Sequence, residues 1–262
     1  HDPTMQNTAL VTGASSGIGK ELARLHAAAG GDLVIVARRE NVLQELRSEL
    51  QRDHQISVRC LPADLTEPNA PQQLFDQIAG EGIEIDWLVN NAGFGGHGRF
   101  HEREWERDRA MIQLNITALT HLCHLFLPPM IARGRGRVLN VASTAGFLPG
   151  PLQAVYYATK AYVLSLSQAM AEELRDDGVT VTALCPGPVA TEFAEVGDLD
   201  DIAAFKTAAS AASVAKIGYK EMSDGKLVAI NDRKLSFMLN WLVPVLPRRT
   251  VLKLSRQAAP HD

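Results

Sequence analysis

The sequence predicts a single α/β domain with a doubly wound parallel sheet and helices on both faces. Short apolar runs rich in β-branched residues alternate with longer stretches of helical periodicity through most of the 262 residues. The apolar runs lack the strict alternation of half-exposed strands, which indicates strands buried on both faces. No Ser/Gly-rich linker or internal repeat divides residues 8–262, so one domain is expected. Residues 1–7 have no apolar signal core and are expected to be a tag remnant and lead-in.

Six strands and five helices follow from this pattern in chain order. The strands are short, mainly apolar runs, whereas the helices show apolar residues at three- and four-residue spacing. The predicted strands cover residues 9–12, 33–37, 57–61, 87–90, 137–142 and 179–185, and the predicted helices cover residues 18–29, 40–53, 69–80, 103–132 and 154–176. A last short strand at 227–230 is expected to close the sheet edge.

The chain after Pro186 departs from this regular pattern. Residues 187–213 are Ala-rich and acidic, and are expected to form a substrate flap or a plain surface excursion. Residues 231–262 are expected to form a basic and apolar helical extension. Its apolar run is too short to span a bilayer. A packed helix is the expected form, while a cover for the substrate cleft, a subunit interface and peripheral membrane contact are alternatives.

Composition excludes several classes of function. The formal net charge is −4 and no long basic tract is present, so no nucleic-acid partner is expected. Cys60, Cys123 and Cys185 lie far apart without a CxxC pair, which favours a reducing, cytoplasmic setting without disulfides or structural zinc. His121 and His124 have no third ligand nearby, so no metal is expected. No window reaches the ~18 uninterrupted apolar residues of a spanning helix.

Three glycines follow the first predicted strand. Gly13 can adopt the positive φ of a tight turn, while Gly17 and Gly19 allow the backbone to approach a phosphate and the sheet. The helix that begins here offers free N–H groups to a phosphate. A purely structural turn is the alternative. The expected pyrophosphate contacts are Gly13, Ser15, Ser16, Gly17, Ile18 and Gly19.

The end of the second predicted strand bears on the choice of cofactor. An acid at this position favours NAD, whereas an arginine favours the 2′-phosphate of NADP. The chain has Arg38 and Arg39 here and no acid, so NADP is expected over NAD. The alternative is that both arginines are solvated at a helix start. Asp64 follows the third strand and could accept from adenine, or could cap the helix that opens near Pro68.

Tyr156 and Lys160 are spaced to act together on a helix. Residues four apart lie on the same helix face, so the lysine ammonium is expected to lower the phenol pKa from its usual value of about 10. Such a phenol can exchange a proton near neutral pH. Tyr157 is a competitor, because it lies three residues from Lys160.

Ser143 and Asn115 are two further polar candidates. Ser143 follows the fifth predicted strand, where its hydroxyl could donate to a substrate oxygen that gains negative charge. Asn115 interrupts the apolar stripe of the long helix, and could bend it or hold a water that relays protons to Lys160. For each residue alone, a cap, a turn or a satisfied core position is the alternative.

A charged run and three phenylalanines lie near the predicted motifs. Residues 101–109 alternate acids and bases and are expected to form a solvated face, with Trp105 packed against the protein. Phe94, Phe147 and Phe193 follow strand ends, and either line a substrate pocket or pack in the core.

Taken together, the motifs resemble the short-chain dehydrogenase/reductase family from about residue 8 to residue 191. The motifs that carry the resemblance are residues 12–19, Asp64, residues 90–93, Asn115, Ser143, residues 156–160 and residues 186–191. The family's spacing from Ser143 selects Tyr156 over Tyr157. The resemblance implies a Rossmann-type sheet of about seven strands in the order 3-2-1-4-5-6-7, assembled as a homodimer or homotetramer.

The resemblance also implies a role for each matched residue. Tyr156 would be the acid/base, Lys160 would hold the nicotinamide ribose, and Ser143 would orient the carbonyl. Asn115 would complete the proton relay. The further cofactor contacts that it implies are Leu65, Asn91, Ala92, Gly93, Tyr156, Lys160, Pro186, Gly187, Val189 and Thr191.

Two functions from different classes fit this sequence. The first is an NADP-preferring oxidoreductase that moves hydride between nicotinamide and a small-molecule carbonyl or secondary alcohol, with an apolar, lipid-like substrate favoured. The second is a dinucleotide-binding regulatory protein without turnover. The intact set of Ser143, Tyr156 and Lys160 favours the enzyme.

Overall fold

A seven-stranded parallel sheet forms the centre of the molecule. The computed structural model describes residues 7–190 and 208–258. The strands are β1 (Ala9–Thr12), β2 (Leu33–Ala37), β3 (Val58–Pro62), β4 (Trp87–Asn90), β5 (Gly136–Val141), β6 (Val179–Leu184) and β9 (Val228–Ala229). Their order across the sheet is β3-β2-β1-β4-β5-β6-β9, and every neighbouring pair is parallel. Counted along the chain, this is the order 3-2-1-4-5-6-7, so the predicted fold is confirmed.

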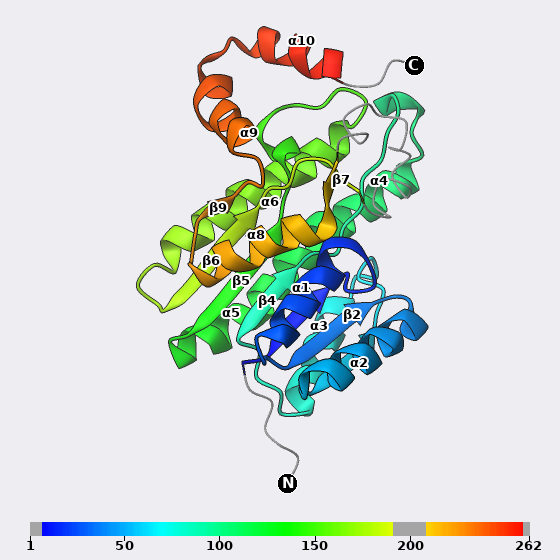
Figure 1. Ribbon diagram of the computed structural model, residues 1–262. Helices are drawn as coiled ribbons and strands as arrows, with labels where there is room; N and C mark the ends of the chain where they lie inside the picture. Colours follow the sequence, from blue (N-terminus) through cyan, green and yellow to red (C-terminus); the bar gives the residue numbers. More distant parts are fainter. Residues whose placement is uncertain (1–6, 191–207, 259–262) are drawn as a thin grey trace.

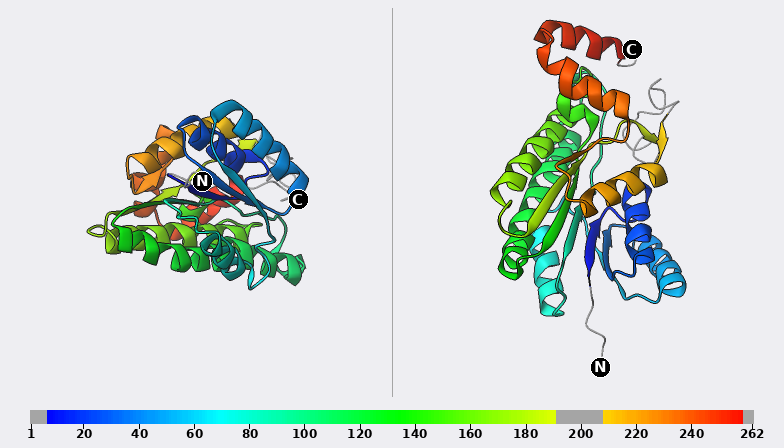
Figure 2. Two further views of the ribbon diagram at one scale, coloured as in Figure 1. Left: turned by 90° about the horizontal axis from the view of Figure 1, so that it is seen from below. Right: turned by 60° about the vertical axis from the view of Figure 1, so that its left-hand side comes forward.

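Helices cover both faces of the sheet (Figure 1 and Figure 2). One face carries α1 (Gly17–Ala28), α2 (Glu40–His54) and α8 (Ala211–Ser223), and the other carries α3 (Ala70–Gly80), α5 (Leu119–Arg133) and α6 (Ala154–Glu173). Successive residues of β1 enter different cores: Leu10 packs in the same cluster as Phe126, and Val11 in the same cluster as Leu22. Burial on both faces explains why the strands are apolar without alternation.

The long helix predicted over 103–132 is one continuous helical stretch. It consists of α4 (Trp105–Ile112), a π-helical stretch (Gln113–Ala118) and α5. Among the described residues, Trp105–Arg133 is the helix that could cross a membrane by length and composition alone. Its residues Leu122, Phe126 and Met130 are buried in the core beside the sheet. Packing on the sheet therefore accounts for much of its apolar character.

Outside the active site, the structure departs from the sequence predictions in three places. Trp105 is 64% exposed, so the prediction that it packs against the protein was wrong. Within the charged run 101–109, Asp108 is buried and ion-paired with Arg103, so this run is not a uniformly solvated face. Helix α8 was not predicted at all. Of the predicted flap, residues 191–207 lie outside the described residues, while β7 (Val189–Ala190) pairs with β8 (Ala209–Ser210).

Residues 231–258 form a C-terminal segment at the carboxyl end of the sheet (Figure 1). The segment contains α9 (Arg233–Phe237), a π-helical turn (Met238–Leu242), a 3-10 turn (Val243–Val245) and α10 (Arg248–Ala258). Two hydrogen bonds anchor it. Asn231 Oδ1 accepts from Gly187 N at 2.9 Å, and Ser255 Oγ donates to Pro149 O at 2.6 Å. The C-terminal segment therefore lies beside the loops that follow β5 and β6.

Candidate active site

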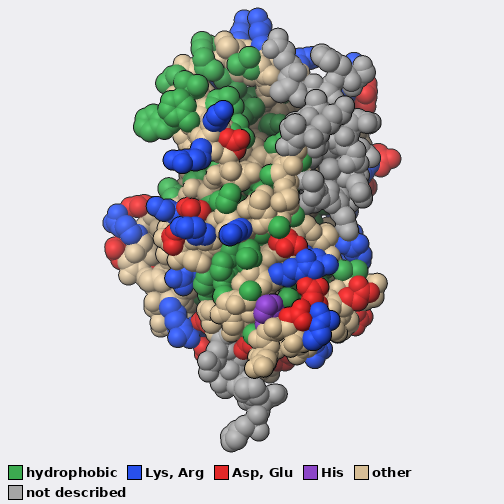
Figure 3. All heavy atoms as spheres, in the orientation of Figure 1, with side chains coloured by type: hydrophobic (Ala, Val, Ile, Leu, Met, Phe, Trp, Pro, Cys, Tyr) green, Lys and Arg blue, Asp and Glu red, His purple; other side chains and the backbone are tan. Residues whose placement is uncertain are grey.

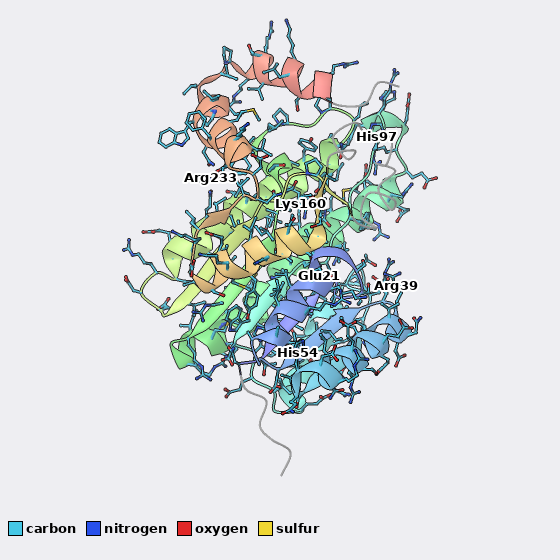
Figure 4. All side chains as sticks on the ribbon, viewed as in Figure 1. Glu21, Arg39, His54, His97, Lys160 and Arg233 are labelled. Atoms are coloured by element: carbon cyan, nitrogen blue, oxygen red, sulfur yellow. The ribbon has the colours of Figure 1, made fainter. Side chains whose placement is uncertain are left out.

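A cavity of about 540 Å³ opens at the carboxyl ends of the strands. Parallel strands bring the loops that follow them to one edge of the sheet, which is where ligands bind in folds of this class. Lys160 on α6 and Arg39 just after β2 both belong to the lining and are labelled in Figure 4. The cavity therefore joins loops from both halves of the sheet.

The glycine loop after β1 has the geometry expected of a phosphate cradle. Gly13 has φ +66° and Gly17 has φ +54°, both in the left-handed region that favours glycine. Helix α1 begins at Gly17, and its first N–H groups lie beside the cavity. A Cβ on Gly19 would lie 2.4 Å from Gly13 O, so the third glycine is required by close packing inside the loop. Gly19 itself does not line the cavity.

The side chain of Asn91, which follows β4, stabilises the glycine loop by hydrogen bonds. Its Nδ2 donates to Thr12 O at 3.0 Å and to Gly13 O at 3.1 Å. Thr12 Oγ1 in turn accepts from the backbone N–H groups of Asn91 and Ala92. These bonds fix the loop after β4 against the glycine loop. The side chain of Asn91 is thus committed to the protein, while the residue still lines the cavity.

The polar residues after β2 and β3 form one end of the cavity. Arg38 and Arg39 are exposed and line it, and Arg39 Nη2 donates to Ser15 Oγ at 3.2 Å. Asp64 Oδ1 accepts from both Thr66 N and Thr66 Oγ1. Burial raises the pKa of Asp64, but the bonds from Thr66 and the charge of Arg38 outweigh it, so the pKa lies below its usual value. Asp64 therefore caps its own turn and not the helix α3, which begins at Ala70.

Tyr156 and Ser143 meet inside the cavity. Tyr156 is buried, and burial raises the pKa of its phenol well above the usual value, while a hydrogen bond with the Ser143 side chain acts in the opposite direction. Ser143 Oγ accepts from Ala145 N at 3.1 Å and donates to Pro186 O at 3.4 Å. The serine is thus fixed between the loops after β5 and β6.

Lys160 lines the same cavity. Its Nζ donates to Val141 O at 2.8 Å and is 5.8 Å from the centre of the Tyr156 ring. Burial lowers the pKa of Lys160 to about 8. The expectation that Lys160 brings the Tyr156 pKa below its usual value does not hold here, because desolvation of the phenol dominates.

Asn115 is held by a different set of contacts, within the π-helical stretch. Its Oδ1 accepts from Phe94 N at 3.2 Å, and its Nδ2 donates to Phe94 O at 3.0 Å and to Thr159 Oγ1 at 3.1 Å. The helix departs from regular α geometry at Asn115, which lies within the π-helical stretch. Asn115 does not line the cavity. A Cβ on Gly93 would lie 3.0 Å from Asn115 Oδ1 and 3.7 Å from Lys160 Nζ, so Gly93 lies beside both side chains.

The match to a known family extends over most of the described fold. A family model described as short chain dehydrogenase matches residues 7–200. The chain belongs to the short-chain dehydrogenase family. The predicted family and the predicted oxidoreductase class are therefore confirmed.

Individual members of the family match nearly the whole chain. The very-long-chain 3-oxoacyl-CoA reductase of Macaca fascicularis is 29% identical over 263 residues, covering 97% of this chain and 80% of the relative. A short-chain dehydrogenase from Sphingobium yanoikuyae, solved in complex with NADPH, superposes with a TM-score of 0.83 and is 32% identical. The match covers 97% of this chain and 98% of the Sphingobium chain. The bulky-bulky ketone specific alcohol dehydrogenase from Comamonas testosteroni has a TM-score of 0.81 and 29% identity, with 98% of each chain covered.

Most predicted site residues of this short-chain dehydrogenase lie around this cavity. Those that line it are Gly13, Ser15, Ser16, Gly17, Ile18, Arg38, Arg39, Asp64, Leu65, Asn91, Ala92, Gly93, Ser143, Tyr156, Lys160, Pro186, Gly187 and Val189. Thr191 lies outside the described residues, as does Phe193. Phe94 lines the cavity, whereas Phe147 packs against the core. The roles of these residues, homo-oligomeric assembly and cytoplasmic location stay predictions.

The cavity also contains residues that sequence reasoning missed. Leu114, Gly150 and Gln153 line it, and Ser255 reaches it from α10. Gly150 faces the ring of Tyr157, which a Cβ would approach to 2.3 Å. Proximity to Tyr156 along the chain could have suggested Gln153. No sequence signal points to Ser255, because its place at the cavity depends on how the C-terminal segment folds back.

Proposed function

We propose that this short-chain dehydrogenase is an NADP-preferring enzyme that interconverts an apolar carbonyl compound and its alcohol. One observation carries the proposal. The hydrogen-bonded pair of Ser143 and Tyr156 shares a cavity with Lys160, with the glycine loop and with Arg38. A proton donor and a dinucleotide cradle thus face the same space.

The residues present fit a phosphorylated dinucleotide. The start of α1 offers N–H groups to a pyrophosphate. At the end of β2 the chain has Arg38 and Arg39 and no carboxylate to accept from a ribose 2′-OH, so a 2′-phosphate is the better match in charge. The relative from Sphingobium yanoikuyae was solved with NADPH, which supports the same choice. The bound cofactor supplies or accepts the hydride.

The chain's own residues would handle the proton and the substrate oxygen. Burial raises the pKa of Tyr156, so the phenol is protonated at neutral pH and can donate to a carbonyl oxygen during reduction. Ser143, fixed between two loops, can donate to the same oxygen. Lys160 has a pKa of about 8, so it is mainly charged at neutral pH and would stabilise the phenolate left behind. The protonated phenol is therefore the form of Tyr156 that serves carbonyl reduction.

The substrate end of the cavity favours an apolar molecule. Phe94, Leu114, Tyr157 and Val189 contribute to the lining there. Two of the relatives act, by name, on a very-long-chain 3-oxoacyl-CoA and on bulky-bulky ketones. We therefore propose a bulky or long-chain apolar ketone as the substrate class.

The test is NADPH oxidation with a panel of apolar ketones, comparing the wild type with Tyr156→Phe. Loss of a general acid should lower kcat by about 10²- to 10⁴-fold. Tyr157→Phe is the matched control, since Tyr157 lines the same cavity and is expected to retain most of the activity. Full activity of Tyr156→Phe would refute the mechanism. If the wild type binds NADPH and reduces none of the ketones, the non-catalytic regulatory alternative is favoured instead.

A further inference from the structure

The C-terminal segment exposes a row of large apolar side chains. Phe237, Met238, Trp241, Leu242 and Val245 are between 41% and 78% exposed, and we call these five residues the apolar patch. They are one or three residues apart along consecutive helical turns, from the end of α9 to the 3-10 turn, while Leu239 between them is buried. Monomeric proteins rarely leave so many large apolar side chains together at the surface without a partner. Figure 3 shows apolar side chains gathered on this part of the molecule.

Cations flank the apolar patch on both sides along the chain. The Lys and Arg residues of the C-terminal segment are Arg233, Lys234, Arg248, Arg249, Lys253 and Arg256, and all are exposed. None of them forms an ion pair with a residue in the part of the chain that the structure describes. The one carboxylate among residues 231–256, Asp232, caps α9 by accepting from Lys234 N and Leu235 N. Arg233 is labelled beside α9 in Figure 4. On a chain with net charge −4, the segment is a local concentration of positive charge.

The apolar patch and its flanking cations together indicate which kind of partner fits this surface. A second copy docked face to face would bring the same cations against each other, which disfavours the contact. An anionic lipid surface matches both features, because aromatic and aliphatic side chains enter the headgroup region while Lys and Arg contact the phosphates. We propose that the C-terminal segment docks this enzyme on an anionic lipid surface through the apolar patch and its flanking cations.

Docking would also orient the molecule. Helix α10 lines the cavity through Ser255, which is anchored to Pro149 O. The bonds of Asn231 with Gly187 N and of Ser255 with Pro149 O fix the C-terminal segment to the body of the protein, so it does not need to detach in order to dock. The end of the molecule that bears the cavity would therefore face the lipid. The docking proposal itself does not depend on which reaction the cavity supports.

The experiment is co-sedimentation of the full chain with vesicles. One set contains phosphatidylcholine alone, and the other contains phosphatidylcholine with phosphatidylglycerol. We expect binding to the anionic set that weakens with added NaCl. Phe237→Ser/Trp241→Ser/Val245→Ser and Arg248→Gln/Arg249→Gln/Lys253→Gln should each weaken binding by about tenfold or more. Phe100→Ser/Trp105→Ser is the matched control, since these residues are 68% and 64% exposed outside the segment, and it should bind as the wild type does.

Three outcomes would overturn the proposal. The first is that the wild type does not bind anionic vesicles. The second is that the control variant loses as much vesicle binding as the apolar-patch variant. The third is that the apolar-patch variant differs from the wild type only by a lower mass at sedimentation equilibrium. The last result would identify a second copy as the partner. The unfolding midpoint in urea and the affinity for NADPH show that each variant is folded. Vesicle binding needs no turnover, so failure of the proposed reaction leaves this test intact.

Discussion

Asn115 Nδ2 donates a hydrogen bond to Thr159 Oγ1 at 3.1 Å, and both residues are only 1% exposed. Thr159 Oγ1 also donates to Tyr156 O at 2.8 Å. The threonine therefore joins the π-helical stretch to α6, one residue before Lys160. It ties the loop that holds Phe94 to the helix that bears the proposed acid.

Thr159→Val should lower both the stability and the activity of the protein by removing this hydrogen bond. The substitution keeps the shape but removes the acceptor for Asn115 Nδ2, and an unsatisfied buried donor costs about 1–3 kcal/mol. We expect the free energy of unfolding in urea to fall by that amount, together with kcat. Thr159→Ser keeps the hydroxyl and should lose less. Equal stability of Thr159→Val and the wild type would show that the hydrogen bond contributes nothing.

Arg38→Ala should change cofactor preference. If Arg38 pairs with a 2′-phosphate, its loss removes a charge-assisted hydrogen bond of about 1.5–3 kcal/mol, or roughly 10- to 150-fold in NADPH affinity. The affinity for NADH should change little. Titration calorimetry with both cofactors measures the two losses. Arg47→Ala is the control for net charge, because Arg47 is a half-buried residue of α2 that does not line the cavity. Parallel losses for NADPH and NADH would contradict the assigned role.

Lys160 should make stability depend on pH in a defined window. Burial lowers its pKa to about 8, whereas the unfolded chain titrates near 10.4, so between these values the unfolded state binds more protons. The contribution of Lys160 to the free energy of unfolding therefore rises with pH from about 8 to about 10, and is least favourable below pH 8.

Lys160→Met carries no charge to bury and should lack this slope. The stability of the wild type relative to the variant should increase across the window by up to about 3 kcal/mol. Urea denaturation at a series of pH values measures the difference, in which the titration of Tyr156 largely cancels. Parallel pH profiles for the two proteins would mean that Lys160 is not desolvated as the structure indicates.

Gly19→Ala should disturb the cradle, whereas Gly80→Ala should not. A Cβ on Gly19 would lie 2.4 Å from both Gly13 O and Asn91 Nδ2, and overpacking of this kind costs about 1–3 kcal/mol. A Cβ on Gly80, at the end of α3, meets nothing within 4 Å. We expect a lower melting temperature and weaker NADPH binding only for Gly19→Ala. Similar behaviour of the two variants would show that the loop adapts.

The strands of the seven-stranded sheet were predicted to within one or two residues because burial on both faces leaves a clear sequence pattern, whereas β7 and β8 were not predicted. Residues 57–61, for example, correspond to β3 (Val58–Pro62). Helix α8 was missed because its buried face relies on small residues such as Ala215 and Gly218, and the Ala-rich stretch resembled a flap. Trp105 was expected to pack against the protein because it is large and apolar, but it is the first residue of α4 and is 64% exposed.

Sequence motifs identified the residues of the site, but their hydrogen bonds and pKa values depend on the tertiary structure. Spacing along the helix left both Tyr156 and Tyr157 open, and the hydrogen bond to Ser143 belongs to Tyr156. The sequence suggested that Lys160 lowers the phenol pKa. Desolvation, which depends on everything packed around the pair, acts on both groups and reverses the shift. Burial of this kind has no local signature in the chain.

The same limit applies to Arg103, which was expected to be solvated and is instead part of a buried ion pair. Its Nε and Nη2 donate to Asp108 Oδ1 at 2.8 Å and 2.6 Å, and its Nη1 donates to His97 O at 2.7 Å. The two side chains are 10% and 6% exposed. A Cβ on Gly96 would lie 2.3 Å from Arg103 Nη2, so the loop from Phe94 to Gly98 wraps around the guanidinium.

Arg103→Met should therefore be far more costly than a change in an exposed arginine nearby. It leaves the Asp108 carboxylate buried without its partner, which costs about 3–5 kcal/mol, and it releases the loop that places Phe94 at the cavity. Arg109→Met is the matched control, because the pair of Arg109 and Glu106 is 62% and 70% exposed and contributes about 1 kcal/mol or less. Urea denaturation and kcat/KM for an apolar ketone measure both effects. If the two variants lose similar stability, the ion pair at Asp108 does not hold this loop, and another contact must fix Phe94 beside the site.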